Sequence, residues 1–311
     1  RDVAPSRGLG DVYKRQIWCT PLWSERRGDG MKIGLIGAGR MGFTLGRHLS
    51  DFAKSHAEML CVEGFYSRNP ESAREAARFT GTKYYEDMET LVQACDTIFL
   101  TVPDGQIANV AEEIAASSVC LDGKTMIHTS GALSSRIFSG MGSRVSGYSI
   151  HPIYAVNSKT DSYIHFQDCY MTIEGEGTKT QELICLFEKM GHTIRQISAD
   201  QKAKYHASAV FASNLVIGLY KMGTTLLSEC GFTPEEAEHA LMPLFANNAE
   251  NMEHFGCEKA LTGPVSRGDV ATVEKHLQAL DGDAREVYRL LSKQLCNADS
   301  QAIQTILDMK E

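Results

Sequence analysis

Residues 31–42 read Met-Lys-Ile-Gly-Leu-Ile-Gly-Ala-Gly-Arg-Met-Gly. Their first half is an apolar run typical of a buried strand, and glycines at 37, 39 and 42 follow it with Gly-x-Gly-x-x-Gly spacing. An amphipathic pattern then predicts a helix over 40–55. A strand, a turn without side chains and a helix N-terminus form the phosphate-binding unit of a Rossmann fold, because backbone N–H groups can approach a pyrophosphate there. A glycine-rich turn without a ligand is the alternative interpretation.

Each glycine of this turn has its own predicted role. Gly37 permits the tight turn, Gly39 leaves space where the backbone meets the pyrophosphate, and Gly42 allows the helix to approach the strand. We therefore predict that a dinucleotide is bound by Gly37, Ala38, Gly39, Arg40, Met41 and Gly42.

The sequence that follows continues this architecture as far as residue 197. Short β-rich runs alternate with amphipathic stretches, which favours an α/β class with a mainly parallel, doubly wound sheet and helices on both faces. The expected strands are 32–36, 59–67, 82–85, 96–102, 124–129, 145–151, 169–174 and 192–198. The expected helices are 40–55, 70–80, 87–95, 105–117, 133–140 and 179–190. Residues 31–197 are thus predicted to form a Rossmann nucleotide-binding domain.

Residues 198–311 show helical patterns only, which predicts a second, all-helical domain. One long helix is expected over 199–229, and the next begins at Thr233-Pro234 with a capping threonine and a proline in the first turn. After a loop over 262–269, two more helices are expected at about 270–280 and 283–308.

Residues 1–30 differ from the rest of the chain. They hold both tryptophans, Trp18 and Trp23, without helical or strand periodicity, and they lack the apolar centre of a secretory signal. We interpret them as a non-native or disordered extension, of translated upstream or library-derived sequence, with Met31 as the natural start. A genuine flexible arm is the alternative.

Composition argues against several classes of protein. The chain has 31 Lys and Arg against 39 Asp and Glu, a net charge of −8, whereas a nucleic-acid binder needs a basic face. It has no run of eighteen apolar residues, so we expect no membrane span. None of the nine cysteines forms a Cys-x-x-Cys pair. This favours reduced, mostly buried thiols in a cytoplasmic protein that holds no metal.

The end of the second strand selects the form of the dinucleotide. NAD enzymes usually place an acid there for the ribose 2′-hydroxyl, whereas this chain has Tyr66-Ser67-Arg68. A guanidinium can bind a 2′-phosphate through two hydrogen bonds, so Ser67 and Arg68 predict NADP(H) as the cofactor. Glu63, the nearest acid, is expected in the middle of the strand. Arg68 as a plain surface arginine is the alternative.

Loops after the later strands are expected to line the same crevice, because ligands bind at the carboxyl ends of parallel strands. We expect backbone N–H groups there to serve the nicotinamide ribose or a substrate carboxylate. His151 ends the sixth strand and is a candidate for substrate binding, with a structural loop histidine as the alternative. His128 is expected to be structural. The predicted cofactor-binding loop residues are Thr101, Val102 and Pro103 after the fourth strand, and Ser130 and Gly131 after the fifth.

Several motifs occur together along the chain: Tyr66-Ser67-Arg68, His128-Thr-Ser-Gly-Ala132, His151-Pro152, Lys202-Ala-Lys-Tyr205-His206-Ala207, Phe211-Ala-Ser-Asn214, Leu261-Thr-Gly-Pro264 and Arg267-Gly-Asp269. As a set, they make residues 31–311 resemble the superfamily of 6-phosphogluconate, β-hydroxyacid and pyrroline-5-carboxylate reductases. The most similar subgroup comprises Rossmann-like oxidoreductases whose C-terminal domain has no known function. This resemblance implies an NAD(P)-binding domain joined to a helical domain that commonly forms a homodimer. It implies little about the substrate.

In the β-hydroxyacid dehydrogenases of this superfamily, a helix lysine and an asparagine four residues later lie over the nicotinamide and the substrate. Here Lys202 falls at a similar place, but His206 stands four residues on. Lys202, His206 and Ser213 share one helix face, with Asn214 to the side. We expect His206 to exchange the catalytic proton and Lys202 to polarise or hold the substrate. The alternatives are a solvent-exposed Lys202 and a packing role for His206.

Further substrate contacts are expected from Ser213 and Asn214, and from Arg267, which could bind a carboxylate. An Arg267–Asp269 pair that braces a helix start is the alternative. These features together predict an NADP-dependent oxidoreductase that transfers hydride between NADP(H) and a small carbonyl, imine or hydroxy-acid substrate, as a homodimer built through the C-terminal helices. The competing hypotheses are a non-catalytic NADP(H)-binding sensor and an enzyme with a deazaflavin or quinone partner.

Overall fold

The computed structural model describes residues 30–143, 145–296 and 300–308. The interpretation of residues 1–30 as an extension therefore concerns a segment that, apart from Gly30, lies outside the described residues. The described residues form two compact units, divided between Ser213 and Asn214.

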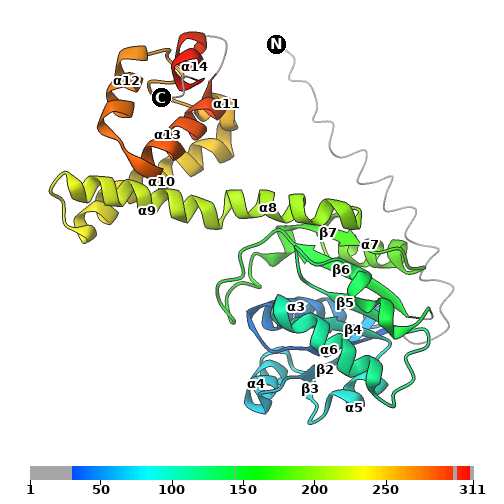
Figure 1. The fold of residues 1–311 in the computed structure, drawn as a ribbon. Helices are drawn as coiled ribbons and strands as arrows, with labels where there is room; N and C mark the ends of the chain where they lie inside the picture. The colour runs from blue at the N-terminus through cyan, green and yellow to red at the C-terminus, as the bar shows by residue number, and fades with distance from the viewer. Residues whose placement is uncertain (1–29, 144, 297–299, 309–311) are drawn as a thin grey trace, which may run out of the picture. The chain divides into compact units, whose positions relative to one another are not determined.

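The first unit is built on an eight-stranded sheet with the order β3-β2-β1-β4-β5-β6-β7-β8 (Figure 1). The described strands pair in parallel except for β6 and β7, which are antiparallel. The mainly parallel, doubly wound fold class is confirmed. The strands are β1 Met31–Ile36, β2 Leu60–Tyr66, β3 Lys83–Tyr84, β4 Thr97–Leu100, β5 Thr125–His128, β6 Ser146–Pro152, β7 Tyr170–Glu174 and β8 Thr193–Gln196.

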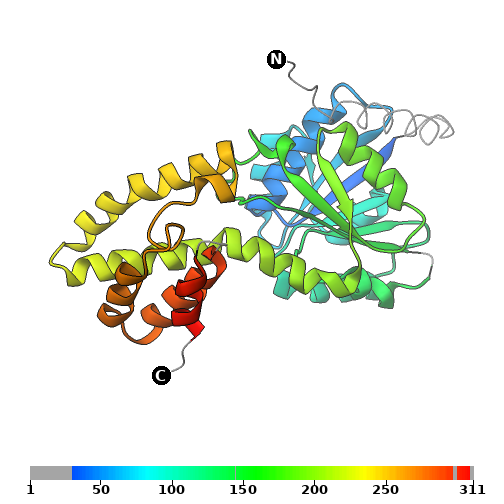
Figure 2. The same ribbon diagram turned by 90° about the horizontal axis from the view of Figure 1, so that it is seen from above.

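Helices cover both faces of this sheet (Figure 2). One layer consists of α3 Arg40–Ala53, α4 Pro70–Thr80 and α7 Thr180–Lys189. The other consists of α5 Met88–Ala94, α6 Asp104–Ala116 and the 3-10 helix η1 Ser135–Met141. Successive side chains of a strand point to opposite faces. In β4, Phe99 accordingly packs with the first layer, and Ile98 and Leu100 pack with the second, so the strand is buried on both sides.

The order of the strands reverses beside β1. β2 and β3 lie on one side of β1, and β4 lies on the other. The loops that follow β1 and β4 therefore start next to each other, with the Thr101 N–H donating to the Ile36 carbonyl at 2.8 Å. In open α/β sheets, ligands bind at the carboxyl ends of the strands at such a reversal.

The helix that enters at Lys202 is shorter than predicted. After η3 (Ala199–Gln201), α8 runs over Lys202–Ala212 and α9 over Asn214–Glu229. Ser213 separates them with φ −127° and ψ −86°, so the prediction of one continuous helix is wrong at this residue. The Ser213 hydroxyl donates to the Ala209 carbonyl at 2.7 Å, a local bond of the kind that bends helices.

Residues 199–229 bear on the expected absence of a membrane span. Despite its charged residues, this stretch has a window of mean hydropathy 1.3, long and apolar enough to cross a membrane by length and composition. The absence of an uninterrupted apolar run of eighteen residues therefore does not by itself exclude a membrane span. One such helix is a weak indicator, because packed helices of soluble proteins meet the same criteria.

Among its described residues, the second unit consists of helices joined by loops, without a strand. α9 and α10 (Pro234–Phe255) run antiparallel (Figure 2), and the Tyr220 hydroxyl donates to the Glu238 carbonyl at 2.7 Å. The predicted start of α10 is confirmed, since Thr233 and Glu236 form a capping box. The helix expected over 283–308 is divided in two. The remaining helices are α11 Cys257–Ala260, α12 Val270–Ala279, α13 Gly282–Leu295 and α14 Gln301–Asp308.

The cysteines are less buried than predicted. Of the eight described cysteines, all free, Cys95, Cys169 and Cys185 are buried. Three are exposed: Cys120 lies in the loop between α6 and β5, Cys230 follows the end of α9, and Cys257 begins α11. The prediction of mostly buried thiols is wrong for these three.

Candidate functional site

The turn after β1 has the geometry that its glycines predict. Gly37 has φ +111°, in the left-handed region that favours glycine. A Cβ on Gly42 would lie 2.2 Å from the Gly37 carbonyl oxygen, so only glycine lets α3 start this close to β1. A Cβ on Gly39 would meet no described atom within 4 Å. Gly39 therefore borders open space, where a ligand can approach the backbone.

Helix α3 begins at this turn. Gly39 is its N-cap, and none of the described side chains caps its first N–H groups. Such an end carries partial positive charge and attracts phosphate. Arg40 and Met41 lie in the first helical turn, and the Arg40 guanidinium reaches the Asn157 carbonyl at 3.5 Å. Thr101 stabilises the turn, since its buried hydroxyl donates to the Gly37 carbonyl at 2.7 Å.

A pocket of about 170 Å³, called the nucleotide pocket below, opens beside the turn. It is lined by eight of the predicted cofactor residues: Gly37, Ala38, Gly39, Ser67, Arg68, Thr101, Val102 and Pro103. Tyr66 of the predicted Tyr66-Ser67-Arg68 motif lines it too. Sequence reasoning did not select the remaining lining residues, which are Ile36, Met88 and the α6 residues Gln106, Val110 and Glu113. These residues fit a dinucleotide, because a turn free of side chains, an uncapped helix end and a guanidinium border one pocket.

Glu63 is engaged elsewhere, on the face of β2. Its carboxylate accepts hydrogen bonds from the Lys83 ammonium at 3.3 Å and the Tyr85 hydroxyl at 3.4 Å. Glu63 does not line the nucleotide pocket. The residues at the end of β2 that line this pocket are Tyr66, Ser67 and Arg68.

Asp104 connects the nucleotide pocket to the loop after β5. It follows Pro103 and accepts a hydrogen bond from the Ser130 hydroxyl at 2.7 Å. The Ser130 N–H donates to Nδ1 of the buried His128 at 3.2 Å. This N–H is thus used within the loop, and ligand binding by Ser130 and by the buried Gly131 stays a prediction.

Lys202 lies beneath the same loop. Its side chain is 1% exposed, and its ammonium donates to the Ser130 carbonyl at 2.9 Å and to the Ser149 hydroxyl. Burial lowers its pKa to about 8, against the opposing effect of Glu174 and Asp104. In this arrangement the ammonium ties the loop to β6, instead of facing a substrate as predicted from the helix face.

Two histidines and a tyrosine gather on the other side of the loop. Nδ1 of His151 lies 2.7 Å from the Tyr205 hydroxyl, and the His151 and His206 rings are 5.9 Å apart. A Cβ on Gly131 would lie 2.4 Å from Cδ2 of His206 and 2.8 Å from Nε2 of His151. Both imidazoles therefore pack directly on Gly131. We call His151, Tyr205 and His206 the histidine cluster.

The histidine cluster contains one residue that sequence reasoning missed. Tyr205 stands three residues after Lys202 and next to His206, so helical spacing already put it near their face. The missing information was its partner, because nothing in the sequence aligns α8 with the end of β6. Burial is the main cause that lowers the pKa of His151 to about 4, and the positive charges of Lys202 and His206 add to it.

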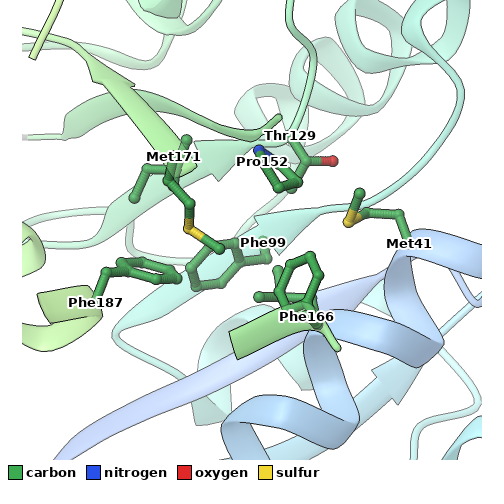
Figure 3. A pocket seen from close by; sticks show the side chains of 9 residues that line it. Met41, Phe99, Thr129, Pro152, Phe166, Met171 and Phe187 are labelled. Atoms are coloured by element: carbon green, nitrogen blue, oxygen red, sulfur yellow. The ribbon is translucent and has the colours of Figure 1, made fainter. Parts of the chain in front are cut away.

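An apolar cavity lies near the start of α3 and the ends of β5 and β6 (Figure 3). One side of it is formed by residues adjacent to predicted site residues, which are Met41, Thr129 and Pro152. The opposite side is formed by Phe99, Phe166, Met171 and Phe187. Its volume of about 10 Å³ holds one water molecule at most. It therefore serves as an apolar floor and not as a binding pocket.

The other predicted substrate residues lie outside the histidine cluster. Ser213 ends α8, whereas Asn214 and the exposed Arg267 belong to the second unit. Asp269 caps α12, since its carboxylate accepts from the Thr272 N–H at 3.1 Å and hydroxyl at 2.8 Å. Substrate binding by Ser213, Asn214 and Arg267 stays a prediction.

Two family models match the chain, a Rossmann-like domain over residues 20–152 and a domain of unknown function, DUF2520, over residues 169–295. The chain is a Rossmann-like protein with a DUF2520 domain. This pair of domains confirms the resemblance inferred from the motifs. Among proteins of curated function, none matches the sequence.

Solved structures share the fold of this Rossmann–DUF2520 protein. One, from Thermotoga maritima, is 25% identical with a TM-score of 0.64, covering 85% of this chain and 96% of that one. A protein from Bacteroides fragilis assigned as an NADP oxidoreductase is 22% identical, with a TM-score of 0.62 over 86% and 98% of the two chains. A pyrroline-5-carboxylate reductase from Coxiella burnetii is 16% identical, with a TM-score of 0.55 over 87% and 100%.

Proposed function

We propose that this Rossmann–DUF2520 protein is an NADP-dependent oxidoreductase that transfers hydride between NADP(H) and a small carbonyl, imine or hydroxy-acid substrate. The observation that carries this proposal is the hydrogen bond of 2.7 Å between Asp104 and Ser130. It joins the nucleotide pocket to the loop on which the histidine cluster packs. Hydride transfer to a polar double bond needs a nucleotide and a proton-exchanging group side by side. The fold shared with known reductases supports the same reading.

Bound NADPH would supply the hydride. The N–H groups at the start of α3 would hold its pyrophosphate, beside Gly39. Ser67 and Arg68 would hold the 2′-phosphate, which a guanidinium binds through two hydrogen bonds. Engagement of Glu63 by Lys83 and Tyr85 supports NADP over NAD, because it removes the nearest β2 carboxylate from the pocket.

His206 would exchange the proton. Its imidazole is half-buried, packs on Gly131 and remains open to water, from which it can recover a proton after each turnover. Lys202 would act as a positioning residue, because its ammonium holds the Ser130 carbonyl under the loop. A sensor that only binds NADP(H) would not need His206 and His151 packed together on that loop, so the histidine cluster favours an enzyme.

Cofactor choice can be tested by fluorescence titration with NADPH and NADH. We expect NADPH to bind at least about tenfold more tightly, and Arg68→Ala to remove that preference, as expected for loss of a paired phosphate contact. Arg78→Ala is the matched control, because Arg78 is exposed on α4 and paired with Glu71. Equal affinity of the wild type for NADH and NADPH would refute the 2′-phosphate assignment.

Catalysis is tested by NADPH oxidation against a panel of keto acids, cyclic imines and aldehydes. An enzyme turns over at least one of them, and His206→Ala abolishes that turnover while NADPH still binds. A sensor binds NADPH and turns over none.

We further propose that the protein is cytoplasmic and that it forms a homodimer through α9 and α10. These helices expose more large apolar side chains than the surface of a monomeric soluble protein usually does. Size measurement in solution should give a dimer, and Ile217→Glu should give a monomer. Binding of the wild type to lipid vesicles would instead assign this surface to a membrane. The exposed residues are Leu215, Ile217, Leu219, Met242, Leu244, Phe245, Met252 and Phe255.

A further inference from the structure

The contact between His151 and Tyr205 has no role in the function proposed so far. Nδ1 of His151 and the Tyr205 hydroxyl are 2.7 Å apart, with the two rings edge-on at 86°. They come from the end of β6 and the first turn of α8. The hydrogen bond from Lys202 to the Ser130 carbonyl also holds the start of α8 against the sheet, close to this contact.

We propose that Tyr205 fixes His151 as the neutral imidazole with its proton on Nε2, and that this N–H is the hydrogen-bond donor for the substrate oxygen or nitrogen. The proposal deepens the oxidoreductase function and rests on it. Tyr205 is then a positioning residue, His151 a catalytic one.

Charges around His151 favour its neutral form. Lys202 and His206 on α8 and His128 on β5 oppose a second proton on its ring, whereas Asp104 on α6 favours one. Burial adds to this, and the pKa of His151 falls to about 4. At neutral pH the ring therefore carries a single proton.

Tyr205 decides which nitrogen carries that proton. Burial raises the pKa of Tyr205, so its hydroxyl keeps its hydrogen and can donate it. We assign Nδ1 of His151, 2.7 Å away, as the acceptor of this hydrogen. A neutral imidazole that accepts at Nδ1 carries its hydrogen on Nε2. With the Tyr205 hydroxyl as donor, the contact therefore fixes the tautomer with its hydrogen on Nε2.

Nε2 is the ring nitrogen on the Gly131 side, and we assign it as the one that meets the substrate. This nitrogen would lie 2.8 Å from a Cβ on Gly131, the residue against which His206 also packs. When hydride adds to the carbon of a carbonyl or imine, the π electron pair moves onto oxygen or nitrogen. The Nε2–H of His151 stabilises that charge without giving up its proton. His206 then donates a proton to the same atom, which completes an alcohol or an amine.

NMR of the ring nitrogens in protein with isotope-labelled histidine tests this assignment. In the wild type we expect His151, identified by its loss in His151→Gln, to be neutral with its proton on Nε2 at neutral pH. In Tyr205→Phe we expect mixed tautomers and turnover lowered by roughly tenfold. Tyr220→Phe is the control, because Tyr220 donates to a backbone carbonyl in the second unit.

The outcomes separate this inference from the proposed function. An imidazolium at neutral pH, a proton on Nδ1, or an unchanged tautomer in Tyr205→Phe would each overturn the assignment. Wild-type protein that shows the expected tautomer but binds no NADPH would refute the oxidoreductase and, with it, the donor role of His151. In all variants NADPH affinity serves as the check on folding, since none of these residues lines the nucleotide pocket.

Discussion

The ammonium of Lys202 lies 2.9 Å from the carbonyl oxygen of Ser130, in a side chain that is only 1% exposed. A buried charge is costly unless it is compensated, and Asp104 and Glu174 supply the opposite charge nearby. Both carboxylates also hold the loop after β5: Asp104 accepts from the Ser130 hydroxyl, and Glu174 accepts from the Ser135 N–H at 2.6 Å. The loop beside the histidine cluster is therefore fixed by three charged groups.

Replacing Lys202 with methionine should mainly reduce stability. Asp104 and Glu174 would lose their shared cation, so we expect the free energy of unfolding to fall by about 1–3 kcal/mol in a urea titration. NADPH affinity should stay within about threefold of the wild type, because Lys202 does not line the nucleotide pocket. Lys204→Met, an exposed lysine of the same helix, is the control. If Lys202 instead contacts the substrate, Lys202→Met keeps its stability and loses turnover alone.

Two glycines of the phosphate loop should respond in opposite ways. Gly39→Asp places its side chain in open space at a helix N-cap, where aspartate is favourable, so thermal stability should be unchanged or higher. The same carboxylate would repel a pyrophosphate, and NADPH binding should weaken by at least about a hundredfold. Undiminished NADPH affinity of Gly39→Asp would contradict the phosphate site.

Gly42→Ala should behave in the reverse manner. Its Cβ would lie 2.2 Å from the Gly37 carbonyl oxygen, a backbone atom that cannot move aside without shifting β1 from α3. Overpacking of this kind costs about 1–3 kcal/mol, so the melting temperature should fall measurably. A variant as stable as the wild type would show that α3 can move away from β1.

Gly131→Ala should uncouple cofactor binding from catalysis. The added Cβ would lie within 3 Å of both His151 and His206, so both rings must move. Displacements near 1 Å at a reacting centre lower rates by about a hundredfold, while NADPH affinity should hold. Gly140→Ala is the control, because a Cβ there meets no described atom within 4 Å. Equal turnover by both variants would place catalysis away from this loop.

The nucleotide-binding half was predictable because its signals are local. The run before Gly37, the glycine spacing and the strand–helix alternation each depend on neighbours in the sequence, and β1 and α3 begin within one residue of their predicted starts. The end of β2 was likewise identified from Tyr66 to Arg68, which line the nucleotide pocket together.

The histidine cluster depends on contacts between distant segments, and here sequence reasoning was incomplete. Helical spacing put Lys202 and His206 on one face, but it could not reveal that the Lys202 ammonium is buried and hydrogen-bonded to Ser130 and Ser149. Nor could it reveal that Tyr205 meets His151, fifty-four residues earlier. The break at Ser213 was missed for a different reason, because a serine inside an apolar helical pattern is common and its bond to Ala209 is one of several it can make.

Acid should destabilise the first unit through a buried pair of histidines. His48 on α3 and His192 before β8 face each other with their Nε2 atoms 2.8 Å apart. Burial lowers the pKa of His48 to about 4, and the charge of His192 lowers it further, against a weaker effect of Asp51. The unfolded chain has the ordinary histidine pKa of about 6.5 and takes up a proton first. The free energy of unfolding should therefore be unaffected by this group above about pH 6.5 and fall between about 6.5 and 4.

A single substitution separates this pair from the other titrating groups. His48→Gln keeps an N–H that can donate to His192, but it cannot be protonated in the unfolded chain. The slope of unfolding free energy against pH between about 6.5 and 4 should then decrease by up to about 1.4 kcal/mol per pH unit. His254→Gln, on the exposed surface of α10, should leave the slope as it is in the wild type. If urea titrations at several pH values give the same slope for His48→Gln and the wild type, the pair is not what acid disrupts.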